Sequence, residues 1–287
     1  MKIPPCSSFV KRGFGDWKIT FCLMSMKLLF FYLPYFSLGI FFLGILYRFW
    51  RWAKTPVPLR IVVPPAPRSR LGVFWRLVGD ILFFPNLFKG DKLLWAGGFS
   101  LHVFLWLVIL RHLRYFLYPV PGWVAAIQTL GLYAGYLIPL PLIFLLARRL
   151  VIDRVLYISI LGDYFALVLL LAVAGSGVLM KVFFRTYIVD VKALVLGLVH
   201  FQPFIPDAHW LFSLHFLLVM ALLIYFPLGK LMHSGGLILS PTRNQRANFA
   251  RRFVNPWDFP VSYNALNLSS PEKYAQALAA SDDGEKS

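Results

Sequence analysis

Long apolar segments separated by short polar connections dominate the chain. Five of these segments reach about 20 residues, the length that an α-helix needs to cross the hydrocarbon core of a bilayer. They predict spans at about 28–50, 93–117, 124–146, 157–182 and 207–233. The pattern therefore predicts an all-α integral membrane protein built as a five-helix transmembrane bundle.

The longest connection, residues 51–92, has two parts. The first, TPVPLRIVVPPAPR, is too rich in proline for a helix and indicates an extended connector. In the second, apolar residues recur at helical spacing from Leu71 to Leu82, with Arg76 and Asp80 on the other face. This segment is too short and too charged to cross a bilayer, so it predicts an interfacial helix on the cytoplasmic surface; a helix that docks a partner would share the pattern.

The two ends of the chain differ from its middle in composition. Residues 1–25 carry basic residues without helical period, and we interpret them as a polar leader or an overlong gene start. Residues 236–287 are polar and basic with several prolines, and they predict a cytoplasmic tail. Residues 26–235 form one predicted transmembrane domain.

Composition supports the membrane assignment. Of the 287 residues, 59% are hydrophobic and 14% are charged, whereas soluble chains are nearer half apolar and a quarter charged. The net charge of +17 would indicate nucleic-acid binding in a soluble protein. In a membrane protein, the Lys and Arg residues that accumulate in cytoplasmic loops explain this charge. In addition, no basic run outside the spans is interleaved with aromatic residues, as it would be in a nucleic-acid-binding surface. We therefore expect the lipid bilayer, and no nucleic acid, among the partners.

Lysine and arginine are distributed unequally between the two sides of the predicted bundle. Nineteen lie on one side, in residues 48–92, in the connection between spans three and four, and in the segment from Lys230 onward. The opposite side has five: Arg111, Arg114, Lys181, Arg185 and Lys192. Because cytoplasmic loops accumulate these residues, the bias places the N-terminus outside and the C-terminus in the cytoplasm, in the cell membrane. Five basic residues at or before the start of span one oppose this bias mildly.

Four histidines lie in two predicted spans: His102 and His112 in span two, His215 and His233 in span five. An ionisable side chain inside a membrane is costly and usually functional, and histidine is a common axial ligand of haem iron. Because these spans run antiparallel, His102 is expected at the height of His233, and His112 at the height of His215. Two low-spin haems need four axial ligands, so the pattern predicts two b-type haems, without the CxxCH motif of covalent attachment. Polar contacts between helices are the alternative explanation.

The histidine spacings are unequal. His102 and His112 are ten residues apart, about 15 Å of helical rise, whereas His215 and His233 are eighteen apart, about 27 Å. With unequal rises, two straight antiparallel helices cannot bring both histidine pairs to equal heights. A kink at Pro227 and Gly229, which lie between the second pair, is one way to reconcile them.

The paired spacings, nine intervening residues in one span and seventeen in a later one, resemble the cytochrome b gamma subunit of respiratory nitrate reductase. The segment HSGGLILSPTRNQRANFARRFVNPWD, which begins at His233, resembles the related membrane cytochrome b of sulfite-reductase-associated electron-transfer complexes. The resemblance implies two bis-histidine haems b, paired His102–His233 and His112–His215.

The same resemblance implies a function. The chain would be the electron-transfer subunit of a menaquinol-oxidising oxidoreductase complex, not catalytically complete alone. It would pass electrons across the membrane to a cytoplasmic iron–sulfur subunit similar to heterodisulfide reductase, in sulfite or sulfate respiration. Further membrane and periplasmic electron-transfer subunits are the expected partners.

The quinol site does not transfer residue by residue. The nitrate reductase family has a quinol-binding lysine near the turn between spans two and three, but here no lysine occurs between Lys92 and Lys181. Lys181, His200 and His209 are candidate quinol contacts, because proton relays in membranes use such residues. A snorkelling lysine and surface histidines are the alternative.

Basic residues near each membrane face have two interpretations. Arg111 and Arg114 flank His112 and are candidates for haem propionate contacts, since guanidinium suits carboxylate; they would serve equally as interfacial anchors. The basic tail and the helix around Arg76 would dock an electron acceptor or bind anionic lipid headgroups.

Two other functions fit the same pattern of spans. The haem scaffold would serve equally in nitrate reductase or another quinol-linked reductase. A non-haem membrane scaffold or transporter is the alternative outside electron transfer. Transporters commonly show internal repeats and polar residues at mid-membrane, whereas this chain shows no clear repeat and its intramembrane polar residues are dominated by histidine.

Overall fold

The computed structural model describes residues 24–55, 66–184, 187–202, 204–206, 209–240 and 242–247, and the regular secondary structure of these residues is helical. Residues 1–23 of the predicted leader and the tail beyond residue 247 lie outside the described residues, whereas residues 24 and 25 begin the first span. Within the described part, five helical segments are long and apolar enough to cross a membrane: Met24–Lys54, Lys92–Tyr115, Gly122–Val151, Leu161–Val182 and Trp210–Leu228. The predicted five spans are confirmed.

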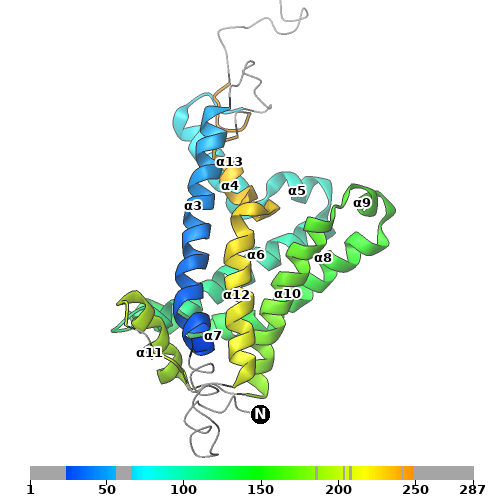
Figure 1. Ribbon diagram of the computed structural model, residues 1–287. Helices are drawn as coiled ribbons and strands as arrows, with labels where there is room; N and C mark the ends of the chain where they lie inside the picture. The colour runs from blue at the N-terminus through cyan, green and yellow to red at the C-terminus, as the bar shows by residue number, and fades with distance from the viewer. Residues whose placement is uncertain are drawn as a thin grey trace, which may run out of the picture.

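Each span is built from one or two helices, and Figure 1 shows their arrangement. They comprise η1 (Leu28–Tyr32) with α3 (Leu33–Lys54), α6 (Lys92–His112) with η2 (Leu113–Tyr115), α7 (Gly122–Leu137) with α8 (Pro139–Val151), α10 (Leu161–Val182), and α12 (Trp210–Leu228). The third span divides at Ile138 because Pro139 has no backbone N–H to continue the ladder and instead begins α8.

Shorter helices connect the spans or follow the last one, and one of those described is predicted from the sequence pattern. That helix, α4 (Arg70–Phe83), begins where the Ser69 hydroxyl accepts a hydrogen bond from the Gly72 N–H at 3.0 Å. The others are α5 (Pro85–Gly90), α9 (Asp153–Ile158), α11 (Ile188–Val199), η3 (Lys230–Met232) and α13 (His233–Ile238). Residues 188–199 were predicted as part of a connection, because an almost wholly apolar segment shows no amphipathic period.

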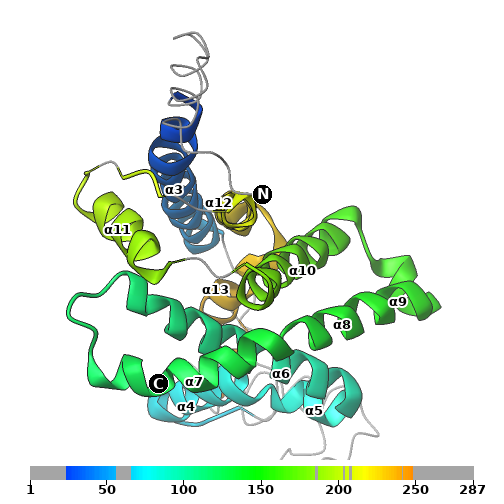
Figure 2. The ribbon, with the colours of Figure 1, turned by 90° about the horizontal axis from the view of Figure 1, so that it is seen from below.

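The spans pack as two groups. Helix α6 packs against α7 and α8, whereas α12 packs against α3 and α10, and contact between α8 and α10 joins the groups (Figure 2). The two histidine-bearing helices, α6 and α12, make at most isolated contacts with each other in the described residues. Large apolar side chains such as Leu43 and Trp106 are exposed on the outer faces, as expected for a surface that meets lipid.

The fifth span is shorter than predicted. Helix α12 ends at Leu228, Gly229 adopts an extended backbone, and η3 and α13 follow, so His233 begins a separate short helix. The expectation of a span to about residue 233 is therefore wrong, whereas the interruption at Gly229 falls where the sequence predicts a kink. An extended residue interrupts the α-helical hydrogen bonding, so the chain turns away and the helical rise between His215 and His233 no longer applies.

Candidate metal sites

The structure brings His102 and His233 together at one end of the bundle, the His233 end. Their ring centroids lie 6.0 Å apart and the ring planes are inclined by 89°. Two imidazoles on one metal ion are expected at about this separation, since each metal–nitrogen bond is about 2 Å and each ring nitrogen lies roughly 1 Å from its ring centre. The separation therefore fits one iron between the rings. Phe84, which links α4 to α5, packs edge-on against His102 at 5.0 Å.

The other two histidines approach each other at the opposite end, the His215 end. His112 is the last residue of α6, and His215 lies in the second turn of α12. The two side chains lie within electrostatic range of one another. A Cβ atom on Gly177 of α10 would lie 3.4 Å from the His215 ring, so this glycine lines the imidazole closely.

Backbone carbonyl oxygens set the tautomer of three of these rings. The Nδ1 atoms of His102, His112 and His233 lie 2.7, 2.7 and 3.0 Å from the carbonyl oxygens of Gly98, Val108 and Lys230. A carbonyl oxygen only accepts, so each Nδ1 must carry the proton. In a neutral ring the lone pair is then on Nε2, the arrangement of a metal-binding imidazole.

A serine does the same for His215. Ser176 on α10 lies 2.9 Å from His215 Nδ1 and donates its own proton to the Val173 carbonyl oxygen at 3.0 Å. The Ser176 oxygen therefore accepts from Nδ1–H, and the lone pair of His215 is again on Nε2. Among the described residues, none of the four Nε2 atoms has a hydrogen-bond partner.

These pairs suit haem iron better than a metal ion bound by protein alone. No group of three or more His, Cys, Asp or Glu side chains that could hold a metal ion occurs in the part of the chain that the structure describes. An iron in a porphyrin receives four nitrogen ligands from the macrocycle and needs only two from the protein. The residues present therefore fit the group that the histidine spacing predicts.

Comparison with known proteins identifies the family of this chain. The sequence profile described as "Nitrate reductase gamma subunit" matches residues 86–243, which hold all four histidines. The chain belongs to the nitrate reductase gamma subunit family. The resemblance inferred from the histidine spacing is thereby confirmed.

Two curated relatives carry a more specific name. Each is called "Hdr-like menaquinol oxidoreductase cytochrome b-like subunit". The Archaeoglobus fulgidus protein is 34% identical, with 78% of this chain and 82% of the relative aligned. The Archaeoglobus profundus protein is 32% identical, with 82% and 84% aligned. This gamma-family chain is thus similar over most of its length to membrane cytochromes of that type.

In this gamma-family chain, the two predicted propionate contacts bind a glutamine on the neighbouring span. Arg111 donates to the Gln128 backbone oxygen at 2.9 Å, and Arg114 donates to the Gln128 side-chain oxygen at 3.2 Å. Both arginines therefore join α6 to α7, and each retains further N–H donors. Gln128 was not singled out from the sequence; its only signal was a polar amide within an apolar span.

The candidate quinol contacts fall at or near the His215 end. Lys181 lies one residue before the end of α10. Two residues after α10 ends, Phe184 stacks on His209 with ring centres 4.0 Å apart. Desolvation lowers the pKa of His209, which precedes α12 and accepts a hydrogen bond from the Leu211 N–H through Nδ1. His200 ends α11, outside these contacts.

Arg76 on α4 has an unusual environment. Its Nη1 atom is buried and has no hydrogen-bond partner among the described residues. Helix α4 packs against α13, which begins with His233. A buried guanidinium nitrogen without a partner is costly, and a carboxylate is its usual partner. Arg76, which the sequence did not single out as a haem contact, is therefore chemically suited to bind a carboxylate group near the His233 end.

Proposed function

We propose that this chain is the di-haem cytochrome b of a menaquinol-oxidising complex, with one haem b held by His102 and His233 and the other by His112 and His215. The observation that carries the proposal is the hydrogen bonding of these rings, in which every Nδ1 atom lies 2.7–3.0 Å from a protein oxygen. All four Nδ1 atoms donate to protein acceptors, which leaves four Nε2 lone pairs in two pairs. Ordinary helix–helix contacts would not require that every ring present the same nitrogen.

The chain's residues perform separate tasks in this function. Each haem, when bound, supplies reversible one-electron chemistry at its iron. The carbonyl groups of Gly98, Val108 and Lys230 and the hydroxyl of Ser176 hold the rings in one tautomer and raise their basicity as ligands. His102 lies in the middle of α6 and His112 is its last residue, so the two pairs lie at different heights along this span and the electron-transfer positions stand in series.

Menaquinol oxidation belongs at the His215 end. Lys181 and His209 lie there as proton acceptors or hydrogen-bond donors for a quinol, and His200 is a further candidate. With the basic connections in the cytoplasm, this end faces outside, and protons from the quinol are released there. Moving each electron inward then stores about 2.3 kcal/mol per 100 mV of membrane potential.

The electron acceptor belongs at the His233 end. There we place a cytoplasmic iron–sulfur subunit similar to heterodisulfide reductase, in sulfite or sulfate respiration. The name of the two relatives, which joins "Hdr-like" to "menaquinol oxidoreductase", supports this choice. Basic residues of α4 and of the segment after α13 supply its docking charge, with further membrane and periplasmic subunits completing the complex. The protein acts in the cell membrane, its N-terminus outside.

The family match favours one alternative. The same scaffold would serve as the gamma subunit of a nitrate reductase or of another quinol-linked reductase. Co-purification distinguishes the two functions: an iron–sulfur partner that resembles heterodisulfide reductase, lost when residues 236–260 are removed, supports the first. Recovery of a nitrate reductase catalytic subunit instead would support the alternative.

Haem content tests the proposal directly. A reduced-minus-oxidised spectrum and a pyridine haemochrome assay on the purified chain should show two b-type haems per chain. A His200→Ala variant, which changes a histidine outside both pairs, should retain both. Purified, folded protein without b-type haem would overturn the proposal and leave a non-haem scaffold or transporter.

A further inference from the structure

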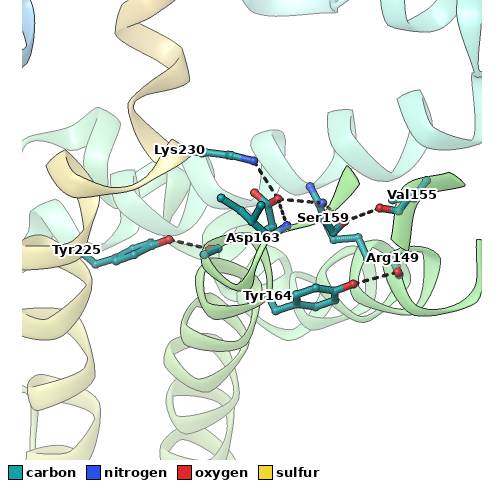
Figure 3. Close-up of polar contacts among 9 residues, drawn as sticks. Arg149, Val155, Ser159, Asp163, Tyr164, Tyr225 and Lys230 are labelled. Atoms are coloured by element: carbon teal, nitrogen blue, oxygen red, sulfur yellow. Dashed lines mark hydrogen bonds and ion pairs between the residues drawn. The ribbon is translucent and has the colours of Figure 1, made fainter. Parts of the chain in front are cut away.

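A buried carboxylate joins three segments at the His233 end. The side chain of Asp163, in the first turn of α10, is only 5% exposed. Its Oδ2 atom lies 2.9 Å from Lys230 Nζ and 3.6 Å from an Arg149 guanidinium nitrogen, and it accepts the Ile160 N–H at 3.1 Å (Figure 3). One carboxylate thus connects α8, α10 and η3.

Lys230 connects this carboxylate to a predicted iron ligand. Its ammonium group binds Asp163, while its backbone oxygen accepts the Nδ1–H of His233 at 3.0 Å. The same residue is therefore held through its side chain and orients the imidazole through its carbonyl. Moving Lys230 would move the group that sets both the tautomer and the direction of the His233 ring.

The His233 segment needs such an anchor, unlike the segments of the other three histidines. His102, His112 and His215 stand on long helices, α6 and α12. His233 follows an extended Gly229 and a three-residue 3₁₀ turn, and 3₁₀ hydrogen bonds are weaker than those of an α-helix. Local structure therefore constrains its position less than it constrains theirs.

Two further hydrogen bonds hold the chain just before this turn. The Tyr225 hydroxyl donates to the Gly162 carbonyl oxygen at 2.7 Å (Figure 3), and Arg48 donates to the Leu228 carbonyl oxygen at 2.8 Å. Both act on α12, before Gly229. Lys230 lies after Gly229, so among these contacts the Asp163 ion pair is the one that acts directly on η3.

We propose that Asp163 is a positioning residue for the His102–His233 site, acting through Lys230. Its carboxylate holds η3 against α10, which places the His233 Nε2 opposite His102. The inference rests on the proposed function only in taking these two histidines as iron ligands. The position of η3 against α10 does not depend on whether a haem is bound.

The charge-removing variant Asp163→Asn tests this, because asparagine keeps the size and an oxygen for the Ile160 N–H. In the full-length holoprotein we expect weaker binding or an altered midpoint potential for one haem, with about 10- to 100-fold lower haem affinity, as is typical when a partner of a ligating histidine is lost. The second haem should keep its potential and its low-spin EPR signal. Lys230→Met should reproduce the change, and Lys230→Arg should largely restore wild-type behaviour.

A matched control separates positioning from general destabilisation. Asp91→Asn removes another carboxylate beside the start of a span, one that binds Arg148 at 3.0 Å and has no contact with η3 among the described residues. This variant should leave both haem signals unchanged. If Asp163→Asn leaves both haems unchanged, or loses both equally, the inference is overturned.

A haem-independent measurement distinguishes failure of this inference from failure of the proposed function. Amide hydrogen exchange across residues 229–233 should accelerate in Asp163→Asn and Lys230→Met but not in Asp91→Asn. Absence of haem from the wild-type protein would sink the proposed function, whereas the exchange result would still test the anchoring of η3. Unchanged exchange in Asp163→Asn would overturn the anchoring.

Discussion

The imidazole rings of His102 and His233 lie 6.0 Å apart, centre to centre, with nearly perpendicular planes. One ring stands on a membrane-spanning helix and the other begins a short helix beyond the end of the fifth span. Helical periodicity alone therefore does not create this pair. The turn at Gly229 and η3 brings His233 to the height of His102.

Alanine substitution of single histidines tests the pairing. His102→Ala and His233→Ala should each remove the same haem, and His112→Ala should remove the other, because each iron loses one of its two protein ligands. Potentiometric titration followed at the b-type absorption bands resolves the two species. If His102→Ala and His112→Ala abolish the same species, the assignment of pairs is wrong.

Ser176→Ala removes the hydrogen-bond acceptor of His215 Nδ1. The ring then loses the group that fixes its tautomer, and we expect about 10- to 100-fold weaker haem binding at the His112–His215 site. Haem retention during dilution and the midpoint potential of that haem measure the effect. Ser100→Ala is the matched control, because among the described residues the Ser100 hydroxyl binds only the Gly97 carbonyl oxygen. An equal response in both variants would contradict the role of Ser176.

Gly131→Ala tests the packing of α6 on α7. An added Cβ would lie 2.7 Å from Arg111 Cβ and 2.8 Å from the Leu107 carbonyl oxygen, so the helices must separate. We expect a loss of about 1–3 kcal/mol in stability, as for other overpacked sites. Thermal denaturation in detergent measures it. Gly39→Ala, where an added Cβ meets no atom within 4 Å, should be tolerated, and equal losses in the two variants would refute the packing argument.

Arg76→Met tests the unpartnered guanidinium. At the proposed His102–His233 haem, loss of the Arg76 charge should disfavour the reduced form, so the midpoint potential should fall by on the order of tens of millivolts, where 59 mV corresponds to a tenfold change in equilibrium constant. The other haem should be unaffected. Arg154→Met, a change in α9, is the control. A change in the midpoint potential of both haems, or of neither, would show that Arg76 does not bind a carboxylate of the proposed haem at the His233 end.

The stability that Asp91 contributes to the fold should depend on pH. It caps α6 by accepting the Leu94 N–H at 2.9 Å, and this hydrogen bond, with help from Arg148, holds the pKa of Asp91 below its usual range. A lowered folded-state pKa contributes stability above the unfolded pKa of about 4, and this contribution is lost as pH falls through the folded value. Asp91→Ala should therefore lower the Tm at pH 7, and the deficit should shrink towards pH 3. Asp91→Asn, which keeps a capping oxygen, should lower the Tm by less. If the loss in Tm of Asp91→Ala does not change with pH, the negative charge of Asp91 does not contribute to stability.

Some of the candidate site follows from sequence and some does not. The histidines stand out because a polar ring inside an apolar span is rare, and their heights follow from the antiparallel order of the spans. Ser176 and Asp163 do not stand out, because a serine or an aspartate near a helix has many ordinary roles. Only the packing of α10 against α12 and η3 places these side chains beside His215 and Lys230.

The sequence by itself determined the five spans, the helix around Arg76 and the family, because the length and apolarity of a segment decide whether it can cross a membrane, and the histidine spacing distinguishes this family. The tertiary structure decided where the fifth span ends, that residues 188–199 form a helix, and which side chains lie beside the histidines, such as Ser176 beside His215. These features depend on contacts between segments far apart in the chain. Hydropathy and spacing, which report on one segment at a time, do not contain them.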